Sequence, residues 1–159
     1  MRWILLLGLT GCIRIADPLP TDQEIGALAA GYDDLIKINP KPYQTTRHAD
    51  RPFVTVWANP TAAATYETLT LESPRPVAFA EGALLVKETF LADGTTVLAV
   101  RYKMPRNYDP KHGDWWYGML RNDGTPLGPD ATGRVAGCNG CHLEAAVSDH
   151  SFGIPAAAH

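Results

Sequence analysis

The sequence contains few cysteines, no long apolar run and no excess of basic residues. Its three cysteines are Cys12, Cys138 and Cys141. The apolar run Trp3 to Leu9 is much shorter than the roughly 20 residues of a transmembrane helix. Lys and Arg number 14 against 17 Asp and Glu, without a basic cluster, which argues against a nucleic-acid partner. These absences leave a small, mildly acidic globular protein.

The first twelve residues, MRWILLLGLTGC, indicate export. They carry one positive charge at Arg2, then an apolar run, then LTGC, which resembles the lipobox cut by bacterial lipoprotein signal peptidase. An ordinary secretory signal without lipidation and a buried N-terminal strand are the alternatives. We predict that residues 1–11 are a lipoprotein signal peptide and that Cys12 carries the lipid. Two or more acyl chains would anchor the protein stably to a bacterial membrane, in the periplasm or another extracytoplasmic space.

The remaining chain has the size of one domain. Removal of residues 1–11 from the 159 leaves 148, enough for a single sizeable core. Arg2 leaves with the signal, so the net charge changes from −3 to −4. The 13 Pro and 14 Gly are spread along the chain, and there is no internal repeat. We predict a tether over residues 12–20 and one domain over 21–159.

The pentapeptide CNGCH, residues 138–142, carries the strongest chemical signal. The C-x-x-C-H spacing is that of c-type haem attachment, in which each thiol adds to a vinyl group and the adjacent His binds the iron. A structural zinc site would need a second ligand pair, which the sequence lacks. A redox disulfide of the thioredoxin type normally belongs to a βαβ unit, and no such pattern surrounds the motif. We therefore predict one covalent haem c, bound by Cys138 and Cys141, with His142 as the metal ligand.

The hydrophobic patterns predict a helix followed by strands. Thr21 and Glu24 form a capping box, and apolar residues recur at helical spacing as far as Ile36, before Pro40 ends the helix. Strands are predicted over 53–57, 83–90, 95–103 and 114–120, with a hairpin turn at Asp93-Gly94. The predicted fold is mainly β (α+β), an antiparallel sheet with an N-terminal helix and a C-terminal haem-attachment segment.

Three stretches occur in a characteristic order: EGALLVKE at 81–88, YDPKHGDWWY at 108–117 and CNGCH at 138–142. Over about Tyr32 to Phe152 this combination resembles the cytochrome P-460 family, which includes the β-sheet cytochromes c′. The resemblance implies a largely antiparallel β fold, often dimeric, with a five-coordinate c-type haem, a proximal His and an open distal pocket. Members with a lysine cross-linked to the porphyrin oxidise hydroxylamine, and members without it bind nitric oxide or other small diatomics.

Lys87 is the candidate for such a cross-link. In a strand it shares one face with Leu85, while Glu88 lies on the other, and the sequence does not say which face meets the haem. A desolvated lysine loses its charge and becomes nucleophilic. Alternatively, Lys87 extends to solvent at the strand edge or pairs with a carboxylate. Lys103 on the next strand is a weaker candidate.

Hydroxylamine oxidation also requires a group that removes protons from the substrate. Glu88, Asp114 and His112 are the candidates, of which we select the two carboxylates. Each has a structural alternative: Glu88 as an ion-pair partner or a solvated charge, Asp114 as a turn cap after Gly113, and His112 as a surface residue. Burial, which the sequence does not give, decides which of them has a perturbed pKa.

A six-coordinate electron-transfer cytochrome is the alternative function. Only seventeen residues follow His142 and none is Met, so a Met as second axial ligand must come from upstream. The candidates are Met104, Met119, His48, His112 and His150. Our first prediction remains an exported monohaem protein with an open distal site for nitric oxide or hydroxylamine, served by a redox partner cytochrome. Its sheet edges would allow a homodimer.

Overall fold

The computed structural model describes residues 18–48 and 51–159. The predicted signal peptide, the lipidation site Cys12 and tether residues up to 17 lie outside the described residues. Within the part that is described, no helix is long and apolar enough to cross a membrane.

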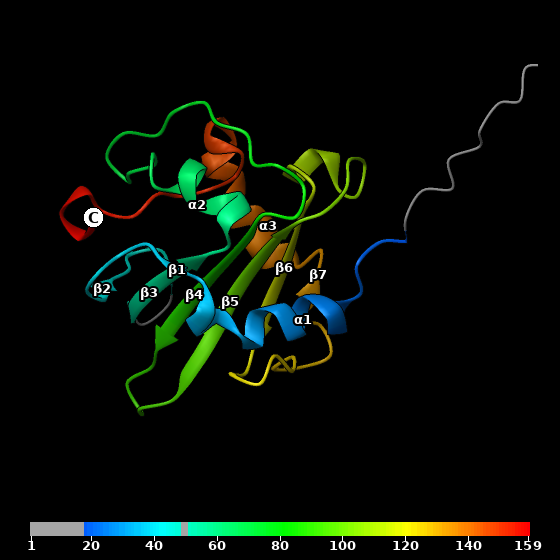
Figure 1. The fold of residues 1–159 in the computed structure, drawn as a ribbon, viewed down its shortest axis with the longest axis horizontal. Coiled ribbons are helices and arrows are strands. Elements are labelled where there is room, and N and C mark those ends of the chain that lie inside the picture. The colour runs from blue at the N-terminus through cyan, green and yellow to red at the C-terminus, as the bar shows by residue number, and fades with distance from the viewer. Residues whose placement is uncertain (1–17, 49–50) are drawn as a thin grey trace, which may run out of the picture.

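One antiparallel sheet forms the centre of the protein (Figure 1). Its strands are β1 (Ile36–Lys37), β2 (Tyr43–Gln44), β3 (Phe53–Ala58), β4 (Leu84–Phe90), β5 (Thr96–Lys103), β6 (Trp115–Leu120) and β7 (Thr132–Gly133). They follow the order β1-β3-β4-β5-β6-β7, and β2 also pairs with β3. The predicted α+β fold, mainly an antiparallel sheet, is confirmed.

The β4–β5 hairpin shows how closely a local signal can specify structure. Lys87 pairs with Ala99, and the turn begins one residue after β4. Gly94 has φ +85°, a conformation that glycine adopts without steric cost, and the Asp93 carboxylate accepts a hydrogen bond from the Thr95 amide at 2.8 Å. The predicted Asp-Gly turn is therefore confirmed.

The N-terminal helix is shorter than predicted. Helix α1 (Asp22–Ala30) begins at the predicted capping box, in which Thr21 and Glu24 cap each other's backbone amides. It ends at Gly31, and a 3₁₀ turn over Tyr32–Asp34 follows. The helical spacing continues in the sequence, but residues 36–37 pair with β3 instead, so sheet pairing overrides the local periodicity.

Two further helices were not predicted. Helix α2 (Pro60–Tyr66) has Asn59 as its N-cap, whose side chain accepts from the Ala62 amide at 3.1 Å, and Pro60 occupies its first turn. Asn followed by Pro is a known helix-start signal. Helix α3 (Ala136–His142) has no side-chain cap and contains two glycines, so its local sequence carries little helical signal.

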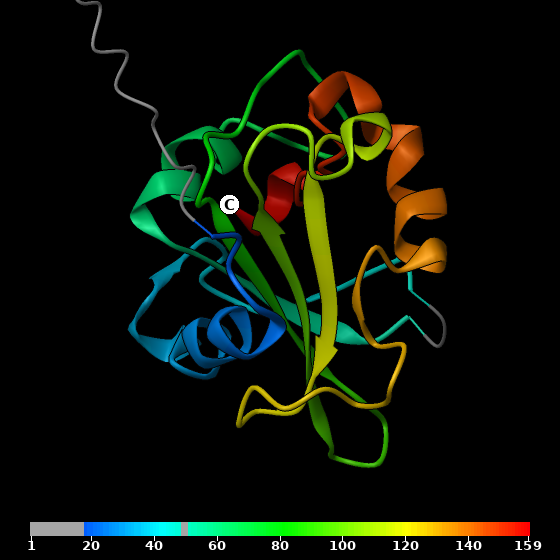
Figure 2. The same ribbon diagram turned by 90° about the vertical axis from the view of Figure 1, so that its right-hand side faces the viewer.

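The sheet separates two apolar clusters, and Figure 2 shows α1 and α3 on opposite sides of it. On one side, α1 packs on a cluster that includes Leu84, Val86 and Trp116. On the other side, α2 packs on a cluster that includes Leu85 and Trp115, and Cys138 of α3 packs against it. Because side chains alternate along a strand, Lys87 faces the α3 side together with Leu85.

Candidate functional site

The C-x-x-C-H motif lies on α3, and the helix explains its spacing. Cys138 and Cys141 are three residues apart and His142 is four residues after Cys138, so all three side chains lie on one helix face. They line a cavity of about 440 Å³ between α3 and the sheet face formed by β3, β4, β5 and β6, hereafter the cavity. This volume is within the range of small-molecule and cofactor sites. Both thiols are free and partly exposed.

The His142 ring is held in one orientation by the C-terminal segment. Its Nδ1 lies 2.7 Å from the carbonyl oxygen of His150. Because a carbonyl only accepts, Nδ1 carries the proton and Nε2 keeps its lone pair. Tyr117 and Phe152 flank the ring, each with a centroid distance of 5.2 Å. Burial, with a further contribution from the nearby Arg101 cation, lowers the pKa of His142 to about 2, so the ring is neutral.

A buried ion pair fixes the segment that holds His142. Asp149 lies next to His150, and its carboxylate is 2.6 Å from the Lys103 Nζ on β5. The same carboxylate accepts from the Phe79 amide at 2.8 Å, and the Asp149 carbonyl accepts from the Trp115 indole at 2.8 Å. These contacts connect the His150 carbonyl to the sheet. The Lys103 amine is held in this ion pair, and Lys103 does not line the cavity.

Lys87 lines the cavity together with the motif residues. Burial, and secondarily the Arg101 cation, lower the pKa of Lys87 to about 8. The ion pairs among the described residues do not include it. The sequence did not decide which face of the strand meets the motif, and the structure places Lys87 on the side of Cys141 and His142.

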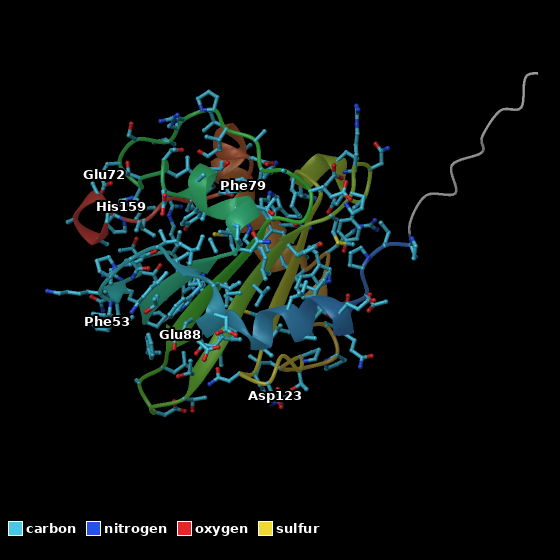
Figure 3. All side chains as sticks on the ribbon, in the orientation of Figure 1. Phe53, Glu72, Phe79, Glu88, Asp123 and His159 are labelled. Atoms are coloured by element: carbon cyan, nitrogen blue, oxygen red, sulfur yellow. The ribbon has the colours of Figure 1, made fainter. Side chains whose placement is uncertain are left out.

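The predicted bases lie away from the cavity. Glu88 is on the α1 side of the sheet (Figure 3), where it accepts hydrogen bonds from the Tyr32 hydroxyl at 2.9 Å and the Trp57 indole at 3.1 Å. Asp114 caps a turn by accepting from the Asp109 amide at 2.7 Å. His112 pairs with the Asp109 carboxylate at 2.9 Å. Within the described ranges, the residues lining the cavity include neither Asp nor Glu.

Two of the five candidate second axial ligands, His48 and Met119, line the cavity. Burial, followed by the charge of Lys87, lowers the pKa of His48 to about 4, which leaves its ring neutral. Met104 is buried in the cluster on the α1 side. Neither His112 nor His150 contributes to the cavity lining.

Arg101 is a cavity residue that the sequence analysis did not single out. It lies on β5 and is only 8% exposed, with its guanidinium 4.0 Å from the centre of the Trp115 ring. Its Nη1 donates to the Ser151 hydroxyl at 2.9 Å. Its Nε and Nη2 are buried without a hydrogen-bond partner among the described residues, and so is the Tyr117 hydroxyl. The sequence did offer one indication of a special role for Arg101, because an arginine is unusual in a strand as apolar as TVLAVRYK.

No family model matches the chain, and no curated protein or solved structure matches it. The resemblance to the cytochrome P-460 family therefore rests on the three sequence stretches alone. The features that bear on function are the chemistry of the cavity and the α3 motif.

Proposed function

We propose that the protein is an exported monohaem c-type cytochrome with an open second axial position for nitrogen-oxide chemistry. The observation that carries this proposal is the convergence of Cys138, Cys141 and His142 on one cavity. The hydrogen bond from His142 Nδ1 to the His150 carbonyl leaves Nε2 available for a metal. This is the donor set that covalent haem attachment requires.

The residues present fit a haem better than the two rival uses of the motif. No group of three or more His, Cys, Asp and Glu side chains suitable for a metal ion occurs within 18–48 and 51–159, so a zinc site has no support there. The motif is not preceded by a strand of a βαβ unit, as a thioredoxin-type disulfide would be. Cys138 and Cys141 would form the thioether bonds and His142 would be the proximal ligand.

When bound, haem supplies an iron centre that binds small nitrogen oxides and exchanges electrons. The chain's own contribution is to orient His142 through the His150 carbonyl and to cover the group with the sheet face. Apolar side chains such as Val56 and Leu85 line part of the cavity and restrict water there. A neutral diatomic ligand suits this lining.

The lining favours nitric oxide binding over hydroxylamine oxidation. Oxidation needs a base beside the substrate, and Glu88 and Asp114 lie outside the cavity. Of the residues that do line it, neutral His48 is the remaining proton acceptor besides His142, because Lys87, with a pKa of about 8, is mostly protonated at neutral pH. A Lys87 cross-link to the porphyrin would move the function toward hydroxylamine, and its lowered pKa supports that reactivity.

A six-coordinate electron carrier is the second candidate function. It is supported by His48 and Met119, which line the same cavity as His142. Ligation by either side chain would block exogenous ligands and leave electron transfer as the activity.

Attachment is tested by the intact mass of the protein purified from a host that exports and matures c-type cytochromes. We expect the mass of the mature chain from Cys12 with its lipid plus one haem, and a pyridine haemochrome spectrum typical of two thioether bonds. Replacement of both Cys138 and Cys141 by Ala should abolish the added mass. The matched control, Cys12→Ser, should keep the haem and release the protein from the membrane fraction. A wild-type protein without haem would refute the proposal.

A further inference from the structure

The segment that orients His142 has a strained backbone. Asp149 and His150 are consecutive non-glycine residues with φ +50° and +57°. This left-handed conformation costs free energy for a residue with a side chain, so it persists only where the surrounding structure holds it. The His150 carbonyl, which accepts from His142 Nδ1 at 2.7 Å, belongs to this strained pair. The orientation of the His142 ring therefore depends on the contacts that fix residues 149–151.

Two cations of one strand hold this segment, one before and one after His150. Lys103 and Arg101 are two residues apart on β5, so their side chains lie on the same face of the sheet. The Lys103 Nζ is 2.6 Å from the Asp149 carboxylate. The Arg101 Nη1 donates to the Ser151 hydroxyl at 2.9 Å. His150 is the residue between these two contacts, so both are needed to fix its carbonyl from either side.

Arg101 also lies beside the rings that flank His142. It pairs with Tyr117 across β5 and β6, and its guanidinium carbon is 5.4 Å from the Tyr117 ring centre. Tyr117 in turn lies 5.2 Å from the His142 ring, measured between centroids. The other flanking ring, Phe152, directly follows Ser151, the residue that Arg101 holds. One side chain thus connects the sheet to the surroundings of His142 at two points.

We propose that Arg101 is a positioning residue that fixes the ring orientation of His142, the candidate metal ligand. It acts through its hydrogen bond to Ser151 and its contact with Tyr117. Arginine suits this role because its planar guanidinium makes directed hydrogen bonds and packs on aromatic rings, here on Trp115 at 4.0 Å. The inference rests on the proposed function only in calling His142 a metal ligand, because the ring is held by the chain's own groups.

The test is the solvent-exchange rate of the His142 Nδ1 proton, measured by NMR on purified protein labelled with ¹⁵N-histidine. The protein is reduced under carbon monoxide, so that a bound haem iron is diamagnetic. Arg101→Met should raise the exchange rate about tenfold or more, the effect of losing a hydrogen bond from a charged group. Arg101→Lys keeps the cation without the planar fork, so it should restore only part of the protection. Ser151→Ala removes only the acceptor and should raise the rate a few-fold.

Leu98→Ala is the matched control for loss of stability. Leu98 is fully buried on the same strand, β5, but belongs to the cluster on the α1 side of the sheet. Urea unfolding gives the stability of every variant. A purely structural role predicts that exchange follows stability alone, whereas positioning predicts faster exchange in Arg101→Met than in Leu98→Ala at comparable stability. If Arg101→Met does not fold, Ser151→Ala gives the reading, and exchange that follows stability alone in the variants that fold refutes the proposal.

Haem-loaded samples provide a second reading that separates this inference from the proposed function. The iron–histidine stretching band in the resonance Raman spectrum of the reduced protein, recorded without carbon monoxide, should shift in Arg101→Met and Ser151→Ala but not in Leu98→Ala. Haem content is measured on the same samples. Protein without haem in which exchange still depends on Arg101 would refute the proposed function and support the positioning role. Haem-loaded protein in which neither exchange nor the band depends on Arg101 would refute the positioning role alone.

Discussion

The Lys103–Asp149 pair offers a direct test of how the protein holds its candidate metal ligand. We consider Asp149→Asn, which removes the charge and keeps a side chain of the same shape. Asp149 has φ +50°, and Asn adopts this left-handed conformation as readily as Asp. The substitution therefore tests the loss of the carboxylate charge without adding backbone strain at position 149.

The expected loss of stability in Asp149→Asn follows from the burial of the ion pair. The two side chains are 13% and 11% exposed, and their charged atoms are 2.6 Å apart. Removing one partner of a buried pair costs about 3–5 kcal/mol, and slight exposure places this pair near the lower end, about 3 kcal/mol. For a chain of this size, that corresponds to a fall in melting temperature of roughly 6–12 °C. The loss should also loosen the His150 carbonyl that orients His142.

The assay is urea unfolding followed by circular dichroism, with the exposed Asp130→Asn as the control. In the double variant with Lys103→Met, part of the lost stability should return, because the lysine is no longer left without a counterion. A loss below about 1 kcal/mol, similar to that of a surface substitution, would show that Asp149 does not hold this segment.

Three further predictions concern the helix start, a tight contact and the cavity lysine. Thr21→Ala should cost about 1 kcal/mol in urea unfolding, since it removes the capping box with Glu24; no change would argue against a cap at this position. Gly124 has φ +80°, and a Cβ there would lie 2.2 Å from the carbonyl oxygen of Gly26. Gly124→Ala should therefore lower the free energy of unfolding by about 2 kcal/mol or more. The control is Gly128→Ala, which should be tolerated because a Cβ there meets no neighbouring atom. Equal losses of stability in the two variants would contradict this packing. The folded-state pKa of Lys87, about 8, is lower than its reference value of 10.5, so the folded state binds fewer protons between these pH values. The free energy of unfolding should then rise with pH from about 8 to 10.5 in wild type relative to Lys87→Met, and parallel curves would show that Lys87 is not desolvated.

Local patterns predicted those parts of the fold in which the sequence and the tertiary contacts agree. The Asp93-Gly94 turn, the strands around it and the capping box at Thr21 are specified by neighbouring residues. The helical spacing as far as Ile36 was misleading, because pairing with β3 stabilises residues 36–37 more than a continued helix would. Helix α3 could not be read from its glycine-containing sequence, since packing against the sheet supports it.

For the candidate site, the sequence identified the motif but not its surroundings. Strand alternation put Lys87 and Glu88 on opposite faces and could not decide which face meets α3. In the structure Lys87 lines the cavity, whereas Glu88 lies on the other side of the sheet and accepts hydrogen bonds from Tyr32 and Trp57. The partner of His142 is a backbone carbonyl, which no side-chain pattern reveals.

The most direct test of the account is the visible spectrum of the reduced, purified protein before and after addition of nitric oxide. We predict a five-coordinate c-type haem spectrum that changes on adding nitric oxide, because in the proposed function His142 would be the proximal ligand and the distal site would stay open. A strongly red-shifted Soret band that Lys87→Ala abolishes would indicate the lysine cross-link and hydroxylamine oxidation. A low-spin spectrum that nitric oxide does not alter would contradict the open site and leave an electron carrier.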